Sequence, residues 1–189
     1  MKTEPETFSI DDLERIGTEP WSGVRSAFAR AYMRQMQVDD AVLFYHSSTE
    51  PPGVAGLARV TRVGVIDETQ FDPDSPYFDP RATRDKPIWD CVDVALVAKL
   101  PHYVSLARLR AEPMLANMVL FRQSRLSVQP ATAAEYAHIV AMAEQPPRPE
   151  PEPKPRRPAA PKRRKPKAKP RKPKPNPRAQ PKAKRRKLP

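Results

Sequence analysis

Hydrophobic and polar residues in the first part of the chain form short runs that change between helical and strand periods. Ser9 and Asp12 form a capping box, and the helix that this box begins can end at Gly17. A turn over 19–23 follows, and a second helix is expected over 25–36. The residues predicted to be buried by these two helices are Ile10, Leu13, Ile16, Phe28, Tyr32 and Met36.

Strands and two more helices are predicted further along the chain. Apolar or alternating runs indicate strands over 41–45, 54–66, 92–98 and 125–129. Ser105 is predicted to cap a short helix, and Thr132 with Glu135 forms the capping box of the last helix. The residues expected to be buried by these helices are Leu106, Leu109, Tyr136, Ile139, Val140 and Ala143.

A long connection over 69–88 separates two of the predicted strands and contains four prolines. Loops of this length are uncommon in compact domains and are often functional. Short strands interspersed with short helices do not fit a regular βαβ repeat. We therefore expect an α+β fold in which a small, strongly curved sheet or barrel carries the helices on its outside.

Composition divides the chain after Gln145. Of the 26 prolines, 15 lie in the last 44 residues, together with 19 of the 34 basic residues and two of the 22 acidic ones. The segment 146–189 therefore carries +17, and residues 1–145 carry −5. The apolar residues of segment 146–189 are five alanines and Leu188, and their burial could not offset the conformational entropy lost on folding. We predict one domain over 1–145 and a disordered Pro/Lys/Arg-rich tail over 146–189.

A tail of this charge is attracted to polyanions. Counterion release favours nucleic acid, which the tail would bind through the phosphate backbone without regard to base sequence. A targeting signal around Lys162-Arg163-Arg164-Lys165 is one alternative. A membrane surface is another, although no apolar face or lipidation motif would hold the tail there.

Residue types that carry catalysis or bind metals are few and dispersed. His46, His102 and His138 lack metal-ligand spacing, and the sequence contains no nucleophile elbow, phosphate loop or dinucleotide motif. Cys91, the only cysteine, lies in a predicted strand and is expected to be a buried, inert thiol. The sequence thus predicts no metal, no cofactor and no catalytic residue. With neither a secretory signal nor a long apolar run, we expect a soluble chain in a reducing compartment.

Seven motifs occur in order between Lys2 and about Ala143. They are Lys2-Thr3-Glu4-Pro5, Trp21-Ser22-Gly23-Val24-Arg25 with Ala29-Arg30, Phe44-Tyr45-His46-Ser47, Pro51-Pro52-Gly53, Phe71-Asp72-Pro73 with Ser75-Pro76-Tyr77-Phe78-Asp79-Pro80, Trp89 with Val92-Asp93-Val94, and Leu126-Ser127-Val128-Gln129-Pro130. Together they resemble the EVE domain family. Two positions depart from its pattern, because Thr3 stands where Ser is frequent and Ser26 where Asn is expected.

The resemblance implies a PUA-like curved β-barrel with short peripheral helices. It also implies a pocket that accepts one base flipped out of a nucleic acid, with modified cytosine in DNA as the favoured ligand. No catalysis is implied for the family as a whole.

A base pocket needs a stacking wall, fixed donors and acceptors, and a cation for the phosphate. Trp21 is the candidate wall and Arg25 the candidate cation, with core packing and a structural ion pair as the respective alternatives. Gly23 would let the backbone approach the ligand, while Thr3 and Glu4 would accept from the exocyclic amine of cytosine. The other predicted binding residues are Lys2, Val24, Tyr45, His46, Ser47 and Gln129.

These observations favour a non-enzymatic reader of modified DNA whose tail adds non-specific affinity. A reader of modified RNA, an enzyme or accessory subunit using Glu4 and His46 as an acid–base pair, and an architectural protein acting through its tail are the alternatives. The compact beginning at Met1 favours a bacterial source, and hence the cytoplasm and nucleoid; in a eukaryote the nucleus is expected. The sequence leaves the oligomeric state open.

Overall fold

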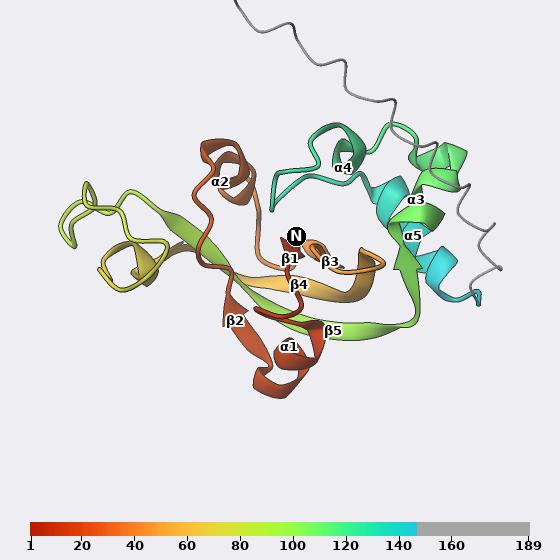
Figure 1. The fold of residues 1–189 in the computed structure, drawn as a ribbon, viewed down its shortest axis with the longest axis horizontal. Coiled ribbons are helices and arrows are strands. Elements are labelled where there is room, and N and C mark those ends of the chain that lie inside the picture. The colour runs from red at the N-terminus through yellow and green to blue at the C-terminus, as the bar shows by residue number, and fades with distance from the viewer. Residues whose placement is uncertain (147–189) are drawn as a thin grey trace, which may run out of the picture. The chain divides into compact units, whose positions relative to one another are not determined.

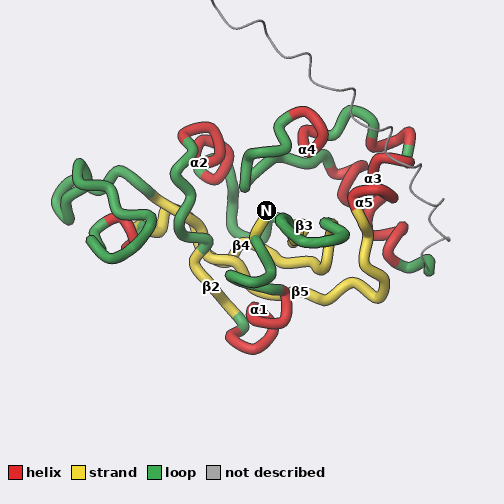
Figure 2. The backbone as a smooth tube through the Cα atoms, in the orientation of Figure 1, coloured by secondary structure: helices red, strands yellow, loops and turns green. Residues whose placement is uncertain are grey.

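The computed structural model describes residues 1–146, in which short helices surround one mixed sheet (Figure 1, Figure 2). The strands are β1 (Lys2–Thr3), β2 (Thr18–Pro20), β3 (Ala41–His46), β4 (Gly53–Ile66) and β5 (Asp90–Ser105). The helices are α1 (Ile10–Ile16), α2 (Ala27–Met33), α3 (Leu106–Ala111), α4 (Val119–Arg122) and α5 (Ala133–Ala143), with 3-10 turns η1 (Glu68–Gln70) and η2 (Pro113–Leu115). The predicted α+β class is confirmed.

The strands form one sheet in the order β1-β3-β4-β5-β2. β1 runs parallel to β3, and all other neighbours are antiparallel. The predicted closure into a barrel is not found, because among the described residues the short strands β1 and β2 remain at opposite edges. The sheet is open but bent. Four register shifts interrupt the pairing of β4 with β5, and such bulges increase the local bend and twist of a sheet.

The helices lie around this sheet at positions that their caps define. In Figure 1, α1 lies below the strands, α2 and α4 lie above them, and α3 and α5 lie at one end of β5. The capping boxes of Ser9 with Asp12 and of Thr132 with Glu135 are both present, as the sequence predicted. Gly17 ends α1 with a φ of 81°, a backbone conformation that glycine adopts without steric cost.

The predicted second helix is shorter than expected and buries a different face. Ser26 caps α2, which ends at Met33. Its buried residues are Ala29 and Met33, whereas Phe28 is 76% exposed. A small residue at the contact lets the helix approach the sheet more closely than a phenylalanine would. Among the residues predicted to be buried in other helices, Ile16 is exposed and Tyr136 and Val140 are only partly buried.

Two further segments differ from their sequence predictions. Residues 125–129 form no strand; a backbone hydrogen bond from Lys2 N to Ser127 O (2.7 Å) attaches them to β1 without a ladder. Alternation of Leu126 and Val128 reflects contact with the core rather than strand pairing. The turn predicted over 19–23 begins as the extended strand β2, which pairs with β5.

Two hydrophobic clusters hold the helices on the sheet, and β3 and β4 contribute to both. One cluster packs α1 and α2 against the sheet and includes Leu13, Trp21, Met33, Phe44 and Val94. The other packs the segments that follow β5 and includes Val54, Val104, Leu109, Leu115 and Ile139.

The connection between β4 and β5 projects from the end of the sheet opposite α3 and α5 (Figure 2). Buried polar side chains fix its base. The amide of Gln70, which is fully buried, donates to Asp67 O and Trp89 O (2.8 and 2.7 Å) and accepts from the backbone N–H groups of Ile88 and Trp89. The Trp89 indole is buried and donates to Asp79 (2.9 Å). Buried hydrogen bonds therefore hold the base of this loop in a defined position.

The predicted tail lies outside the described residues except for Pro146. Within residues 1–146, the longest helices are too short and too polar to cross a lipid bilayer.

Candidate nucleic-acid interface

Two cavities meet at the N-terminal segment, and Lys2 lines both. The larger has a volume of about 810 Å³ and the smaller about 500 Å³. Both volumes lie in the range usual for small-ligand sites. The larger cavity, hereafter the base cavity, contains seven of the eleven predicted binding residues, namely Lys2, Thr3, Glu4, Trp21, Gly23, Val24 and Ser47.

The N-terminal wall of the base cavity is held by β3 and by the loop over 124–127. Ser47 donates to Thr3 O from both its backbone N–H and its hydroxyl (2.7 and 3.0 Å). The Ser48 hydroxyl donates to the Glu4 carboxylate (2.7 Å), and the Lys2 ammonium donates to Ser124 O. Burial lowers the pKa of Lys2. The short strand β1 thus presents its side chains from a fixed backbone.

Trp21 continues the extended course of β2, since its backbone N–H donates to Val92 O (2.8 Å). Phe44, fully buried beneath it, meets the indole nearly perpendicularly with ring centroids 5.5 Å apart. Trp21 is 7% exposed and lines the base cavity. Trp21 therefore packs in the core and also forms part of the cavity wall. The sequence had left these two roles as alternatives.

Gly23 forms a tight turn against an aromatic ring. Its φ is 77°, and its N–H donates to the buried carboxylate of Asp67 (2.9 Å). A Cβ at this position would lie 2.8 Å from the ring of Tyr77, closer than side chains pack. Only glycine satisfies both the positive φ and the approach of Tyr77.

Arg25 lines neither cavity, and the structural ion pair is present. Its guanidinium donates to Asp67 (2.7 Å), to the Thr69 hydroxyl (2.9 Å) and to Tyr77 O (2.7 Å), and lies 5.3 Å from the Trp89 ring centroid. Burial alone would raise the pKa of Asp67, but hydrogen bonds from Arg25, Thr69 and Gly23 hold it below its usual value. Arg25 therefore fixes the loop that carries Tyr77 at the cavity.

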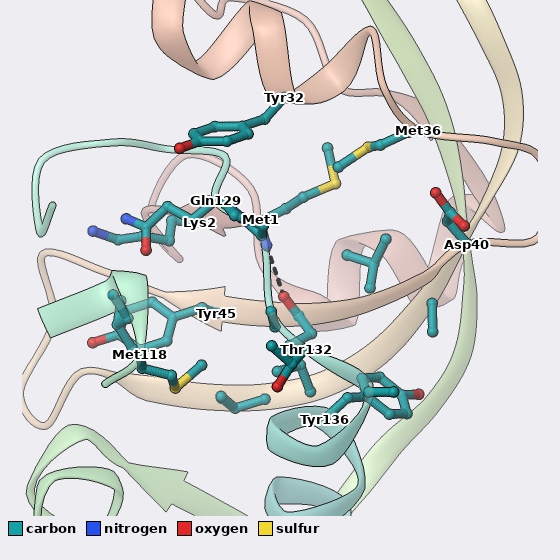
Figure 3. Close-up of a pocket in the computed structure, with 18 of the residues that line it drawn as sticks. Met1, Lys2, Tyr32, Met36, Asp40, Tyr45, Met118, Gln129, Thr132 and Tyr136 are labelled. Atoms are coloured by element: carbon teal, nitrogen blue, oxygen red, sulfur yellow. Dashed lines mark hydrogen bonds between the residues drawn. The ribbon is translucent and has the colours of Figure 1, made fainter. Parts of the chain in front are cut away.

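The remaining predicted residues lie elsewhere. Tyr45 and Gln129 line the smaller cavity, on the same side as Lys2 (Figure 3). His46 lines neither cavity; its Nε2 accepts from the backbone N–H of Ile10 (3.1 Å), and burial lowers its pKa. Glu4 and His46 thus engage different partners and do not form an acid–base pair.

The smaller cavity is mainly apolar. Figure 3 shows the Met1 and Met36 side chains between Tyr32 and Tyr136, with Met118 close to Tyr45. The α-amino group of Met1 donates to Leu43 O (2.9 Å). Other apolar residues that line the smaller cavity are Val42, Leu43, Val54 and Leu120.

Among the cavity residues that the sequence did not predict as binding residues, three carry a charged group or a phenol: Glu19, Tyr77 and Arg125. Tyr77 is 40% exposed and lies in the long loop that its length marked as functional. Arg125 is exposed and makes no hydrogen bond or ion pair with the described residues, and it lies in the segment mistaken for a strand. Glu19 lies in the segment mistaken for a turn. Ser26, the departure from the family pattern, caps α2 and does not line this cavity.

Titratable groups elsewhere form no metal centre in residues 1–146. Cys91 is buried, as expected, and burial raises the pKa of its thiol to about 12, which leaves it protonated.

Comparison with known proteins connects this geometry to one family. The family model for the EVE domain matches residues 1–142. Human thymocyte nuclear protein 1 is 36% identical over 166 residues, covering 78% of this chain and 74% of that protein. A hypothetical protein from Leishmania major is 52% identical with a TM-score of 0.74, covering 76% of this chain and 92% of that one. Human THYN1 in complex with 5-methylcytosine containing DNA is 36% identical with a TM-score of 0.74, covering 78% of this chain and 97% of that one.

Proposed function

This chain belongs to the EVE domain family, and on that basis we propose that it binds DNA and takes a flipped modified base, with 5-methylcytosine as the leading candidate, into the base cavity. The observation that carries the proposal is the composition of that cavity. Aromatic rings, carboxylates, hydroxyls and cations from five separate chain segments line one opening of about 810 Å³. A stacking surface combined with a few polar groups is what recognition of an extruded base requires.

Three aromatic residues line the base cavity, namely Phe8, Trp21 and Tyr77, and stacking falls to Trp21 and Tyr77. Tyr77 offers the larger accessible surface, since it is 40% exposed against 7% for Trp21. Trp21 would support a base from the core side, and Arg25 holds the Tyr77 backbone by a hydrogen bond to its carbonyl oxygen. Base–aromatic stacking contributes about 1–3 kcal/mol per base.

Polar contacts fall to the N-terminal wall and the rim. The hydroxyls of Thr3 and Ser47 and the carboxylates of Glu4 and Glu19 line the cavity. Arg125, unpaired among the described residues, is available to a phosphate next to the flipped base, which replaces the role predicted for Arg25.

The solved complex of human THYN1 supports DNA rather than RNA as the partner. That relative binds DNA containing 5-methylcytosine. If the present chain binds DNA as proposed, it acts in the nucleoid of a bacterium or the nucleus of a eukaryote.

The tail supplies affinity that the first part of the chain lacks. Residues 1–145 carry −5 and segment 146–189 carries +17. A negatively charged domain is repelled by a phosphate chain, whereas the tail releases counterions from it. The tail would therefore tether the chain to DNA without sequence preference and raise the concentration of bases at the cavity.

The test is a competition assay with the full chain against matched duplexes that carry cytosine or 5-methylcytosine at one position, with matched RNA as a further arm. Tighter binding to the modified DNA is expected. Equal binding to all DNA duplexes would contradict the proposed function, and preference for modified RNA would reassign the substrate.

A second arm removes residues 146–189, which leaves every described helix and strand in place. We expect affinity for all duplexes to fall and its salt dependence to flatten, while the preference for the modified base stays. Loss of the preference with bulk affinity retained would contradict this division between tail and cavity.

A further inference from the structure

Glu19 lies in the middle of β2, directly opposite Val94 of β5. Alternate residues of an extended chain project to the same side, so Glu19 and Trp21 leave the backbone together. Both line the base cavity. A carboxylate and an indole therefore form adjacent parts of one wall.

Glu19 differs from Glu4, the other carboxylate of the cavity, in having no partner in the described part of the chain. Glu4 is exposed and accepts from the Ser48 hydroxyl (2.7 Å). Glu19 is partly buried, and no described residue donates a hydrogen bond to it or forms an ion pair with it. Burial and, secondarily, the Asp93 carboxylate raise the pKa of Glu19.

An unpaired, partly buried carboxylate costs free energy in the folded protein. A ligand that donates a hydrogen bond to Glu19 would recover part of that cost, whereas a ligand that presents an acceptor would add to it. The side chain therefore discriminates between ligands by the polarity of the edge they present.

We propose that Glu19 is the specificity-determining residue of the base cavity and accepts a hydrogen bond from the exocyclic 4-amino group of a cytosine base. This inference rests on the proposed function. 5-Methylcytosine and thymine carry the same methyl group but differ at position 4, where one has an amine and the other a carbonyl oxygen. A carboxylate accepts from the amine and repels the carbonyl. Glu19 thus separates 5-methylcytosine from its deamination product.

The experiment measures binding of the full chain to three duplexes that contain 5-methylcytosine, thymine or no base opposite an abasic site. Pairing is then absent from all three, so the cost of flipping does not differ through lost base pairs. Wild type is expected to prefer 5-methylcytosine over thymine by about tenfold or more. Glu19→Gln should abolish or reverse that preference, because its amide can donate to the thymine carbonyl.

Two variants control for charge and for folding. Glu6→Gln removes an exposed carboxylate that does not line the cavity and should keep the wild-type ratio. Glu19→Asp keeps the charge but shortens the side chain by one methylene, and should reduce the preference partially. Thermal melting of each variant checks that it is folded, and Glu19→Asp decides the matter if Glu19→Gln does not fold.

The outcomes separate the two proposals. Equal binding of wild type to all three duplexes would mean that no base enters the cavity, and both proposals would fail. If wild type discriminates and the Glu19 variants keep its ratio, the role of Glu19 is wrong while the proposed function stands. The same conclusion follows if Glu19→Gln weakens both bases equally, or if Glu4→Gln changes the ratio and Glu19→Gln does not.

Discussion

The two cavities share Lys2 but differ in almost everything else. The base cavity combines aromatic rings with carboxylates, hydroxyls and an arginine that has no partner within residues 1–146. The smaller cavity is mainly apolar and is lined by methionine, valine, leucine, alanine and tyrosine side chains, with fewer polar groups such as those of Asp40, Gln129 and Thr132 (Figure 3). Two neighbouring cavities in one fold thus differ in the chemistry of their linings. Both volumes would admit a small ligand, so volume does not indicate which cavity binds the base. The polar edge of a nucleobase needs hydrogen-bonding groups, and these favour the base cavity.

The largest effect should follow from replacing an aromatic residue of the base cavity. Trp21→Leu keeps an apolar side chain against Phe44 but removes the aromatic surface. We expect binding of DNA with a modified base to weaken about tenfold or more, measured by titration.

Tyr136→Leu, in the smaller cavity, is the matched control and should leave binding unchanged. Equal losses from both variants would mean that the two cavities do not differ in function.

Gly23→Ala should give a smaller loss that separates cavity shape from backbone strain. An alanine at positive φ costs about 1–2 kcal/mol, and its methyl group would displace Tyr77. We expect both a lower melting temperature and weaker binding of the modified base.

Gly64→Ala introduces comparable strain, at a φ of 64°, with no atom within 4 Å of the new methyl group. It should lower stability without changing binding. If Gly64→Ala weakened binding as much as Gly23→Ala, contact with Tyr77 would not explain the effect.

The smallest expected effect concerns His46, which lines neither cavity. Burial lowers the pKa of folded His46, and its neutral Nε2 accepts from Ile10 N–H. At mildly acidic pH the unfolded chain therefore takes up a proton at His46 more readily than the folded chain does. The contribution of neutral His46 to the free energy of unfolding is present above about pH 6.5 and is lost as pH falls below that value. The hydrogen bond at stake is worth about 1 kcal/mol.

Thermal melting between neutral and mildly acidic pH measures this contribution. His46→Gln can still accept from Ile10 and should show a weaker dependence on pH than wild type. Identical pH profiles for the two proteins would contradict the assignment.

Local signals in the sequence were sufficient to predict where α1 and α5 begin. Ser9 with Asp12 and Thr132 with Glu135 act through side chain to backbone bonds three residues apart, so a short stretch of sequence contains the whole interaction. The resemblance to a family supplied most of the base cavity, because its motifs contain Lys2, Thr3, Trp21 and Gly23.

Contacts between distant segments could not be predicted in this way. The bond between Arg25 and Tyr77 spans 52 residues, and it converts an expected ligand contact into a structural one. Period alone made 125–129 resemble a strand, since Leu126 and Val128 alternate for the sake of core contact. Glu19 escaped notice because the flanking Pro20 and Gly23 suggested a turn.

Asp67 accepts from Gly23, Thr69 and Arg25 with a side chain that is almost completely buried. Replacing either Arg25 or Asp67 by a neutral residue would leave the other charge buried without a partner, which is strongly destabilising. Positions 25 and 67 are therefore expected to have been inherited as a unit, with substitutions at one accompanied by a compensating substitution at the other throughout the divergence of these proteins.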